Sequence, residues 1–207
     1  MNLKKLKKVI KIIMKRLLLI LILSCSLQTL AEADDIRDFE IEEMSIGDSL
    51  LDYMTKKEIK KNIRNYVPDT SKYYITSFSN LKNYDTLDIY LKRNDKRYII
   101  KSVIGFVFLD FKKCKTKMNL VSTEIDQLFS NAEKIDAGIV EHQYDKTGNS
   151  KEYQIAYLLN KEYEDDHVRI QCTNWSNEIT KEKNWSDSFN VGAYSKEILK
   201  WFSDGYN

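Results

Sequence analysis

The chain has 207 residues, of which 33 are lysine or arginine and 31 are aspartate or glutamate. With 43% hydrophobic residues, one proline and six glycines, its composition is typical of a folded protein and excludes a collagen-like or disordered one. The length suits a single domain, or two small halves that share one core.

Residues 1–33 have the pattern of a secretory signal peptide. Six lysines and one arginine precede or adjoin an unbroken apolar run from Leu17 to Leu23. The run is shorter than the roughly 20 apolar residues that a transmembrane helix needs. Ala31-Glu32-Ala33 then matches the small-x-small cleavage pattern. We therefore expect a periplasmic or secreted protein whose mature chain, residues 34–207, is one exported domain.

Other interpretations of this segment stay open. Translation beginning at Met14 instead of Met1 would give a signal peptide of more ordinary length. Ile22-Leu23-Ser24-Cys25 resembles a bacterial lipobox, which implies a lipoprotein anchored through Cys25. A retained membrane anchor is a further alternative, disfavoured by the short apolar run.

Removal of residues 1–33 changes the charge. It takes away seven basic residues and one acidic residue, which leaves 26 basic and 30 acidic residues and a net charge of −4. A mildly acidic chain without a basic stripe argues against nucleic acid as a partner. We expect an unknown protein or small-molecule ligand in the cell envelope, no transmembrane segment in the mature chain and no cofactor.

Residue periodicity predicts a single α+β domain over residues 34–207. An internal duplication into two similar halves, 34–111 and 112–207, stays open as an alternative. In the first half we expect a short strand near Phe39, two short helices and an antiparallel meander. The helices begin at Asp48 or Ser49 and at Thr55, where Thr55-Lys56-Lys57-Glu58 forms a capping-box pattern. The predicted strands are 73–78, 87–91 and 97–109, the last with a bulge at Gly105.

The second half begins with the clearest helix, predicted over residues 113–131. Its apolar residues recur at steps of three and four, which predicts packing on a sheet. Strands are expected at 140–144, 151–159, 167–175 and 188–194, followed by a C-terminal helix beginning at Ser195. Carboxylates at 162–166 are compatible with a cation, but a solvated turn is favoured because no glycine shapes a binding loop. We therefore predict no metal site.

Gly47-Asp48-Ser49-Leu50 resembles the nucleophile block of the GDSL esterases and lipases. The resemblance implies Ser49 as a catalytic serine, with its base in a late D-x-x-H motif. Neither His142 nor His167 has an aspartate three residues earlier, and residues 39–44 are too charged for a buried parallel strand. We favour Ser49 as a helix N-cap and keep a serine hydrolase as the alternative function.

A longer pattern, I-G-D-S-L-L-D-Y from Ile46 to Tyr53, precedes a lysine-rich helix just behind the signal peptide. In this it resembles an uncharacterised family of small exported proteins from AT-rich marine bacteria, and that resemblance implies no activity. The helix pair before an antiparallel sheet is also similar to small periplasmic modules of the outer-membrane-assembly lipoprotein type. That second likeness concerns the fold alone.

Cys114 and Cys172 are predicted to form a disulfide. They are the only cysteines after residue 33, and an exported chain meets an oxidising compartment. Cys114 lies on the apolar stripe of the long helix, and Cys172 shares a strand face with Val168 and Ile170. Both thiols should therefore point into one helix–sheet interface. Two buried free thiols are the alternative.

The opposite face of the same predicted strand carries His167, Arg169, Gln171 and Trp175. A sheet covered by helices on one side leaves its other face to solvent, and Trp and Arg are frequent interface anchors. These four residues are the predicted binding face of a non-catalytic binding or envelope-interaction module. The alternative is a second layer of core around the aromatic residues.

Overall fold

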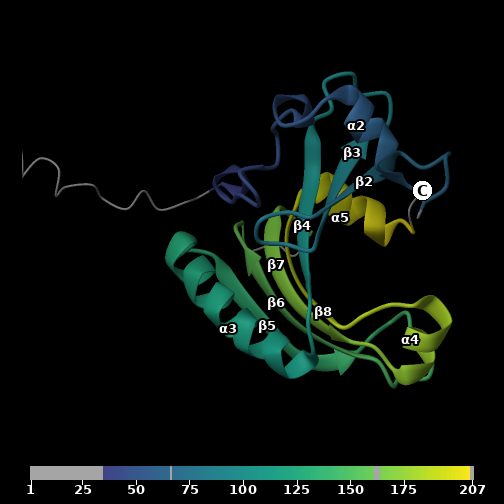
Figure 1. Cartoon of the computed structure of the whole chain (residues 1–207). Helices are drawn as coiled ribbons and strands as arrows, with labels where there is room; N and C mark the ends of the chain where they lie inside the picture. Colours follow the sequence, from purple (N-terminus) through teal and green to yellow (C-terminus); the bar gives the residue numbers. More distant parts are fainter. Residues whose placement is uncertain (1–34, 66, 161–163, 206–207) are drawn as a thin grey trace, which may run out of the picture. The chain divides into compact units, whose positions relative to one another are not determined.

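The computed structural model describes residues 35–65, 67–160 and 164–205 (Figure 1). The predicted signal peptide, its cleavage site and part of the acidic turn, residues 161–163, lie outside them. The described residues belong to one compact unit, Ala33–Asn207.

An eight-stranded antiparallel sheet of order β1-β2-β3-β4-β8-β7-β6-β5 organises this unit. The strands are β1 (Ile63–Arg64), β2 (Tyr73–Ser79), β3 (Thr86–Lys92), β4 (Ile100–Phe108), β5 (Glu133–Glu141), β6 (Lys151–Leu158), β7 (His167–Asn174) and β8 (Ser188–Tyr194). Each half of the chain contributes a meander of four strands, and their last strands, β4 and β8, pair with one another.

The helices among the described residues are η1 (Ile36–Asp38) and η2 (Leu50–Asp52), which are 3-10 turns, and α2 (Lys56–Lys61), α3 (Phe111–Leu128), α4 (Asn177–Lys183) and α5 (Lys196–Ser203). The predicted α+β class is therefore confirmed. The predicted N-terminal helix pair consists of the turn η2 followed by α2.

The capping box that opens α2 is confirmed. The Glu58 backbone N–H donates to Thr55 Oγ1 at 3.3 Å, and Glu58 Oε2 accepts from the Thr55 backbone N–H at 2.8 Å. These reciprocal bonds satisfy two backbone donors that the first helical turn leaves without partners. The helix then ends after six residues, at Lys61.

Helix α3 packs on β7 and β8 and closes the main core from one side (Figure 1). It begins at Phe111, not Lys113, because the Asp110 carboxylate accepts the Lys113 backbone N–H as an N-cap. Its buried stripe includes Cys114, Met118 and Ile125. The segment before β1 covers the neighbouring part of the same sheet face with Ile36, Phe39, Ile41, Met44, Ile46 and Leu50.

The predicted disulfide between Cys114 and Cys172 is present. Their Cα atoms are 5.8 Å apart and both residues are fully buried. The bond joins the first turns of α3 to β7, on the sheet face that also buries Val168 and Ile170. It therefore fastens the helix to the centre of the second meander.

Helix α5 covers one end of the other sheet face and forms a second, smaller core. Its side chains Ile198 and Trp201 pack with Val67, Tyr73, Ile75, Ile104 and Tyr194. Ser195 lies at the predicted N-cap, but its hydroxyl makes no capping bond there; its backbone carbonyl accepts from Ile198 and Leu199. The rest of this face is not covered by α5.

Two details of the first half differ from prediction. The expected strand near Phe39 is a single bridge between Ile41 and Met44, because Glu42 and Glu43 both adopt positive φ and turn the chain. The expected bulge at Gly105 is also wrong. Gly105 pairs regularly with Leu87 and Val191, and a Cβ on it would lie 2.4 Å from the Tyr84 ring. Glycine is needed for close packing, and the register shift is at Tyr90 and Leu91.

Two elements of the second half also differ. Strand β5 spans Glu133–Glu141 in place of the predicted 140–144, because this edge strand is largely exposed and lacks a clear alternation of apolar residues. Helix α4 was not predicted, since its seven residues contain a single buried apolar side chain, Ile179. A short helix with so little buried surface leaves no periodic signal.

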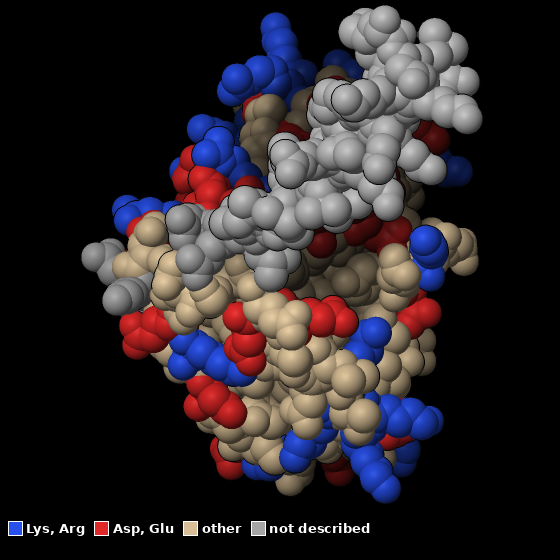
Figure 2. All heavy atoms as spheres, turned by 90° about the vertical axis from the view of Figure 1, so that its left-hand side faces the viewer, with Lys and Arg blue, Asp and Glu red and all other residues tan. Residues whose placement is uncertain are grey.

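Figure 2 shows the side of the molecule to which α3 belongs. Lysine and arginine side chains there alternate with aspartate and glutamate, without one sign dominating the face. Among the described residues, no helix is both long and apolar enough to cross a bilayer.

Candidate functional site

A cavity of about 610 Å³ opens on the sheet face opposite α3, beside the part covered by α5. Its volume is typical of ligand pockets, roughly 300–1,000 Å³. The lining side chains are aromatic, hydroxyl-bearing or amide-bearing apart from two charged ones and a histidine: Arg64, Ser77, Thr86, Asp88, Phe106, Phe108, His142, Tyr144, Gln171, Thr173, Trp175, Asn184, Trp185, Ser186, Ser188 and Asn190.

Strand register brings the floor residues together. Thr86 pairs with Phe106, Phe106 with Asn190, and Asn190 with Gln171. These four residues form one row across β3, β4, β8 and β7, on the face that alternation directs away from α3. The two halves of the chain therefore contribute equally to the floor, and the β4–β8 pairing creates it.

Aromatic rings from three segments meet at one wall of the cavity. The ring centroids of Trp175 and Trp185 are 4.8 Å apart, and those of Tyr144 and Trp185 are 4.9 Å apart. His142 lies against Trp175 at 4.2 Å. The rings of His142, Tyr144, Trp175 and Trp185 together form an aromatic platform. Trp185 is 37% exposed and Tyr144 is 48% exposed, so the platform presents apolar surface to solvent.

The ends of α4 place the two tryptophans. Ser176 caps α4 through its hydroxyl, so the chain turns directly after Trp175. The helix ends at Lys183, its C-cap Asn184 adopts the left-handed conformation with φ 56°, and Trp185 follows directly. Asp187 then accepts the Trp175 backbone N–H at 2.8 Å, which ties the two arms of this connection together.

The loop between β5 and β6 supplies His142 and Tyr144. The Asp145 carboxylate accepts hydrogen bonds from the hydroxyls and backbone N–H groups of both Ser150 and Thr147. The hydroxyl bond from Ser150, followed by that from Thr147, lowers the pKa of Asp145 well below its usual range. The ionised carboxylate therefore fixes the loop that carries half of the aromatic platform.

Beneath the platform, Glu152 organises a buried polar network. Its carboxylate accepts from the Gln154 amide at 2.7 Å and from the Gln171 amide at 2.9 Å, and it lies 3.6 Å from His142 Nε2. Burial raises the pKa of Glu152 and lowers the pKa of His142. His142 Nδ1 also accepts the Tyr144 backbone N–H. Both nitrogens of this ring therefore face protein groups and hold it in place.

The far wall of the cavity carries two charged side chains of opposite sign. Burial raises the pKa of Asp88, while a hydrogen bond from the Ser77 hydroxyl and the nearby Arg64 guanidinium act in the opposite direction. Arg64 and Asp88 are the two charged side chains lining the cavity, and they have opposite signs.

The four residues of the predicted binding face occupy different parts of this sheet face. Gln171 and Trp175 line the cavity. His167 is fully buried, 5.6 Å from the Tyr194 ring, at the end near α5. Arg169 lies with its guanidinium 4.4 Å from the same ring. Sequence reasoning missed two residues of the site: Tyr144, which it placed at the end of a predicted strand, and Trp185, which lies in a segment predicted as a loop. The available signal was a large aromatic side chain in or beside a loop.

Ser49, the alternative nucleophile, is the N-cap of η2. Its hydroxyl donates to the Arg97 carbonyl at 2.7 Å and accepts the Leu51 backbone N–H. Both partners are main-chain groups, neither of them a base. The hydroxyl thus satisfies a free donor at the turn.

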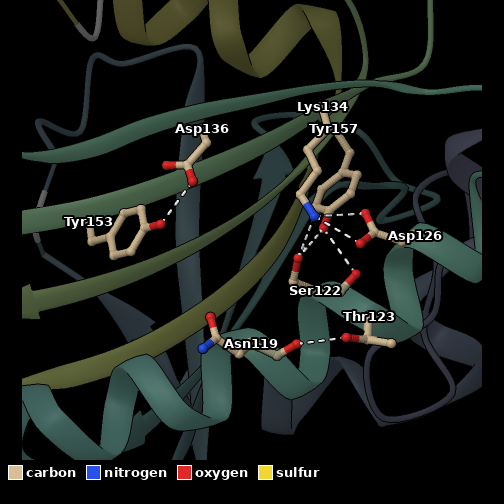
Figure 3. Close-up of polar contacts among 8 residues, drawn as sticks. All are labelled: Asn119, Ser122, Thr123, Asp126, Lys134, Asp136, Tyr153 and Tyr157. Carbon is tan, nitrogen blue, oxygen red and sulfur yellow. Dashed lines mark hydrogen bonds and ion pairs between the residues drawn. The ribbon is translucent and has the colours of Figure 1, made fainter.

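A second polar cluster joins α3 to β5 and β6 (Figure 3). Ser122 Oγ lies 2.7 Å from the Tyr157 hydroxyl and accepts from Lys134 Nζ at 2.8 Å, while Lys134 also bonds Asp126. Burial acts to lower the pKa of Lys134, but the hydrogen bonds to Asp126 and Tyr157 outweigh it, so the pKa is raised. Burial also raises the pKa of Tyr157. Ser122 therefore faces a cation and a neutral phenol, with no base, and we assign the cluster a structural role.

Comparisons of the chain with protein family models, with curated proteins and with solved structures find no match. Among the residues that the structure describes, no group of three or more histidine, cysteine, aspartate or glutamate side chains is placed to hold a metal ion. The cavity with its aromatic platform is thus the candidate site.

Proposed function

We propose that this protein is an exported, non-catalytic binding module of the cell envelope, which holds its ligand in the cavity on the open sheet face. The basic N-terminal segment, the apolar run and Ala31-Glu32-Ala33 support export. The disulfide is compatible with an oxidising compartment. Gln171 and Trp175 are the members of the predicted binding face that contact the ligand under this proposal.

One observation carries the proposal: solvent-exposed aromatic rings lie over a floor of hydroxyl and amide side chains. Apolar surface with a few convergent polar groups is the usual composition of a ligand site. Tryptophan and tyrosine supply large contact areas at low conformational cost and are frequent binding anchors. None of the hydroxyls that line the cavity forms a described hydrogen bond to His142, which favours binding over catalysis.

The mature protein, purified under native conditions from periplasmic extract, is expected to carry a small molecule that mass spectrometry detects after denaturation. The Trp175→Ala variant should lose it, because the anchor of the platform is removed. Leu120→Ala is the matched control, since Leu120 is 65% exposed on α3, away from the cavity. Equal recovery from all three proteins, or from none, would refute the proposed site.

We also expect the exported protein to begin at Asp34, because Ala31-Glu32-Ala33 fits the cleavage pattern better than Cys25 fits a lipidation site. The intact mass of the exported form decides this. A mass that corresponds to a chain beginning at a diacylglyceryl-modified Cys25 would instead establish a lipoprotein.

A further inference from the structure

We infer that the ligand is a neutral oligosaccharide of β-1,4-linked sugars that lies across the Trp175–Trp185 platform. The inference rests on the proposed binding function and specifies the chemistry of its ligand. Four features of the site carry it: a lining without net charge, polar side chains of the floor that are open to a ligand, exposed indole surface and a second hollow beyond the platform.

The charge of the cavity favours an uncharged ligand. Arg64 and Asp88 have opposite signs, so the charges of the side chains that line the cavity sum to zero. The buried Glu152 is occupied by the amides of Gln154 and Gln171. A charged ligand would lose part of its hydration shell at a lining without net charge, which is unfavourable.

The floor offers hydrogen bonds that the protein leaves open. Asn190 and Ser188 are each only 6% exposed and line the cavity. Within the described ranges, neither side chain has a hydrogen-bond partner. Gln171 donates its amide to Glu152 and Thr173, which leaves its carbonyl oxygen as an acceptor. Polar side chains of the floor that make no bond within the protein are available to a ligand, and their hydroxyl and amide groups match the hydroxyl groups of a sugar.

The platform supplies the complementary apolar surface. The two indoles are inclined at 55° to one another, and Tyr144 is inclined at 49° to Trp185. Aromatic faces carry negative potential and attract the weakly positive C–H groups of a sugar ring. β-1,4-linked sugars with equatorial hydroxyls have flat C–H faces and polar rims. A single sugar can therefore stack on an indole while its rim reaches the amides of the floor.

A second hollow makes a chain of sugars the better fit. It has a volume of about 500 Å³ and shares Phe108, Trp175, Trp185 and Ser186 with the first cavity. Because both hollows adjoin the same indoles, the platform has room for ligand on either side. A linear oligosaccharide would occupy both, whereas one sugar ring would leave one of them empty.

Isothermal titration calorimetry of the mature protein with chitotetraose and with cellotetraose tests this inference. At least one of them should bind with a dissociation constant below about 1 mM and about tenfold more tightly than its monosaccharide. Trp185→Ala and Asn190→Ala should each weaken that binding about tenfold or more. Leu120→Ala should leave it unchanged, and circular dichroism verifies that each variant is folded. Trp185→Ala is expected to fold normally because its side chain is partly exposed.

Other outcomes overturn the inference. Failure of both tetrasaccharides to bind would do so, as would binding that Trp185→Ala leaves intact. Titration with choline chloride tests whether the aromatic rings instead form a cage for cations. Binding of choline in place of the sugars would overturn the inference. If the periplasmic purification yields a Trp175-dependent molecule that is not a saccharide, the inference fails while the proposed binding function stands. If neither experiment detects a ligand, both fail.

Discussion

Replacement of Cys114 and Cys172 by alanine is expected to lower the free energy of unfolding by roughly 4 kcal/mol. The bond spans 58 residues, and cross-linking two such distant points reduces the conformational freedom of the unfolded chain. The affected segment holds most of α3 together with β5, β6 and most of β7. Urea unfolding of the mature protein, followed by far-ultraviolet circular dichroism, measures the change.

Reduction provides the control for this prediction. Unmodified protein treated with a phosphine reductant should lose nearly as much stability as the double variant, and the double variant should not respond to the reductant. Two titratable thiols per chain in denatured, unreduced mature protein would show that the bond is absent. A double variant within about 1 kcal/mol of the unmodified protein would contradict the entropic argument.

Trp201→Ala is expected to destabilise the protein by about 3–5 kcal/mol, the range for truncating a buried tryptophan. Its side chain is 2% exposed and lies between Tyr73, at a ring distance of 5.3 Å, and Phe202, at 5.6 Å. Trp201 is the largest fully buried side chain of the described residues, and it belongs to the small core beneath α5. The same urea titration gives the loss of unfolding free energy.

Trp185→Ala is the matched control, since it makes the same substitution at a partly exposed ring. It should change stability by less than about 1 kcal/mol while removing part of the ligand platform. Similar losses in both variants would mean that the cavity wall supports the fold as much as the core beneath α5 does, which contradicts the prediction.

Local chemistry explains which parts of the fold were predictable. The capping box at Thr55 and the alternation through β3 depend on neighbours within a few residues. The Cys114–Cys172 bond followed from two such local patterns, one helical and one extended, with their apolar faces directed toward each other. Helix α4 was not predicted because it buries a single apolar side chain. Most of strand β5 was not predicted because its pairing with β6, more than periodicity, stabilises it.

The sequence predicted only part of the candidate site, for a related reason. Gln171 and Trp175 lie on one predicted strand face, so alternation placed them together. Trp185 and Tyr144 reach them through loops, and Asp88 through the other half of the chain. Their convergence depends on the pairing of β4 with β8. Antiparallel pairing of consecutive strands follows from short turns, but no local signal specifies a pairing over such a distance in the sequence.

The β4–β8 pairing also has a consequence for the order of folding. Ser102 pairs with Tyr194, so the first meander is complete in the growing chain long before its central partner strand exists. Until β8 arrives, one edge of β4 has open backbone donors and acceptors, which can pair with another unfinished chain. Pairings between such distant segments also close slowly. Nascent protein is therefore most prone to aggregate before β8 pairs, and a holding chaperone that shields β4 would act in that interval.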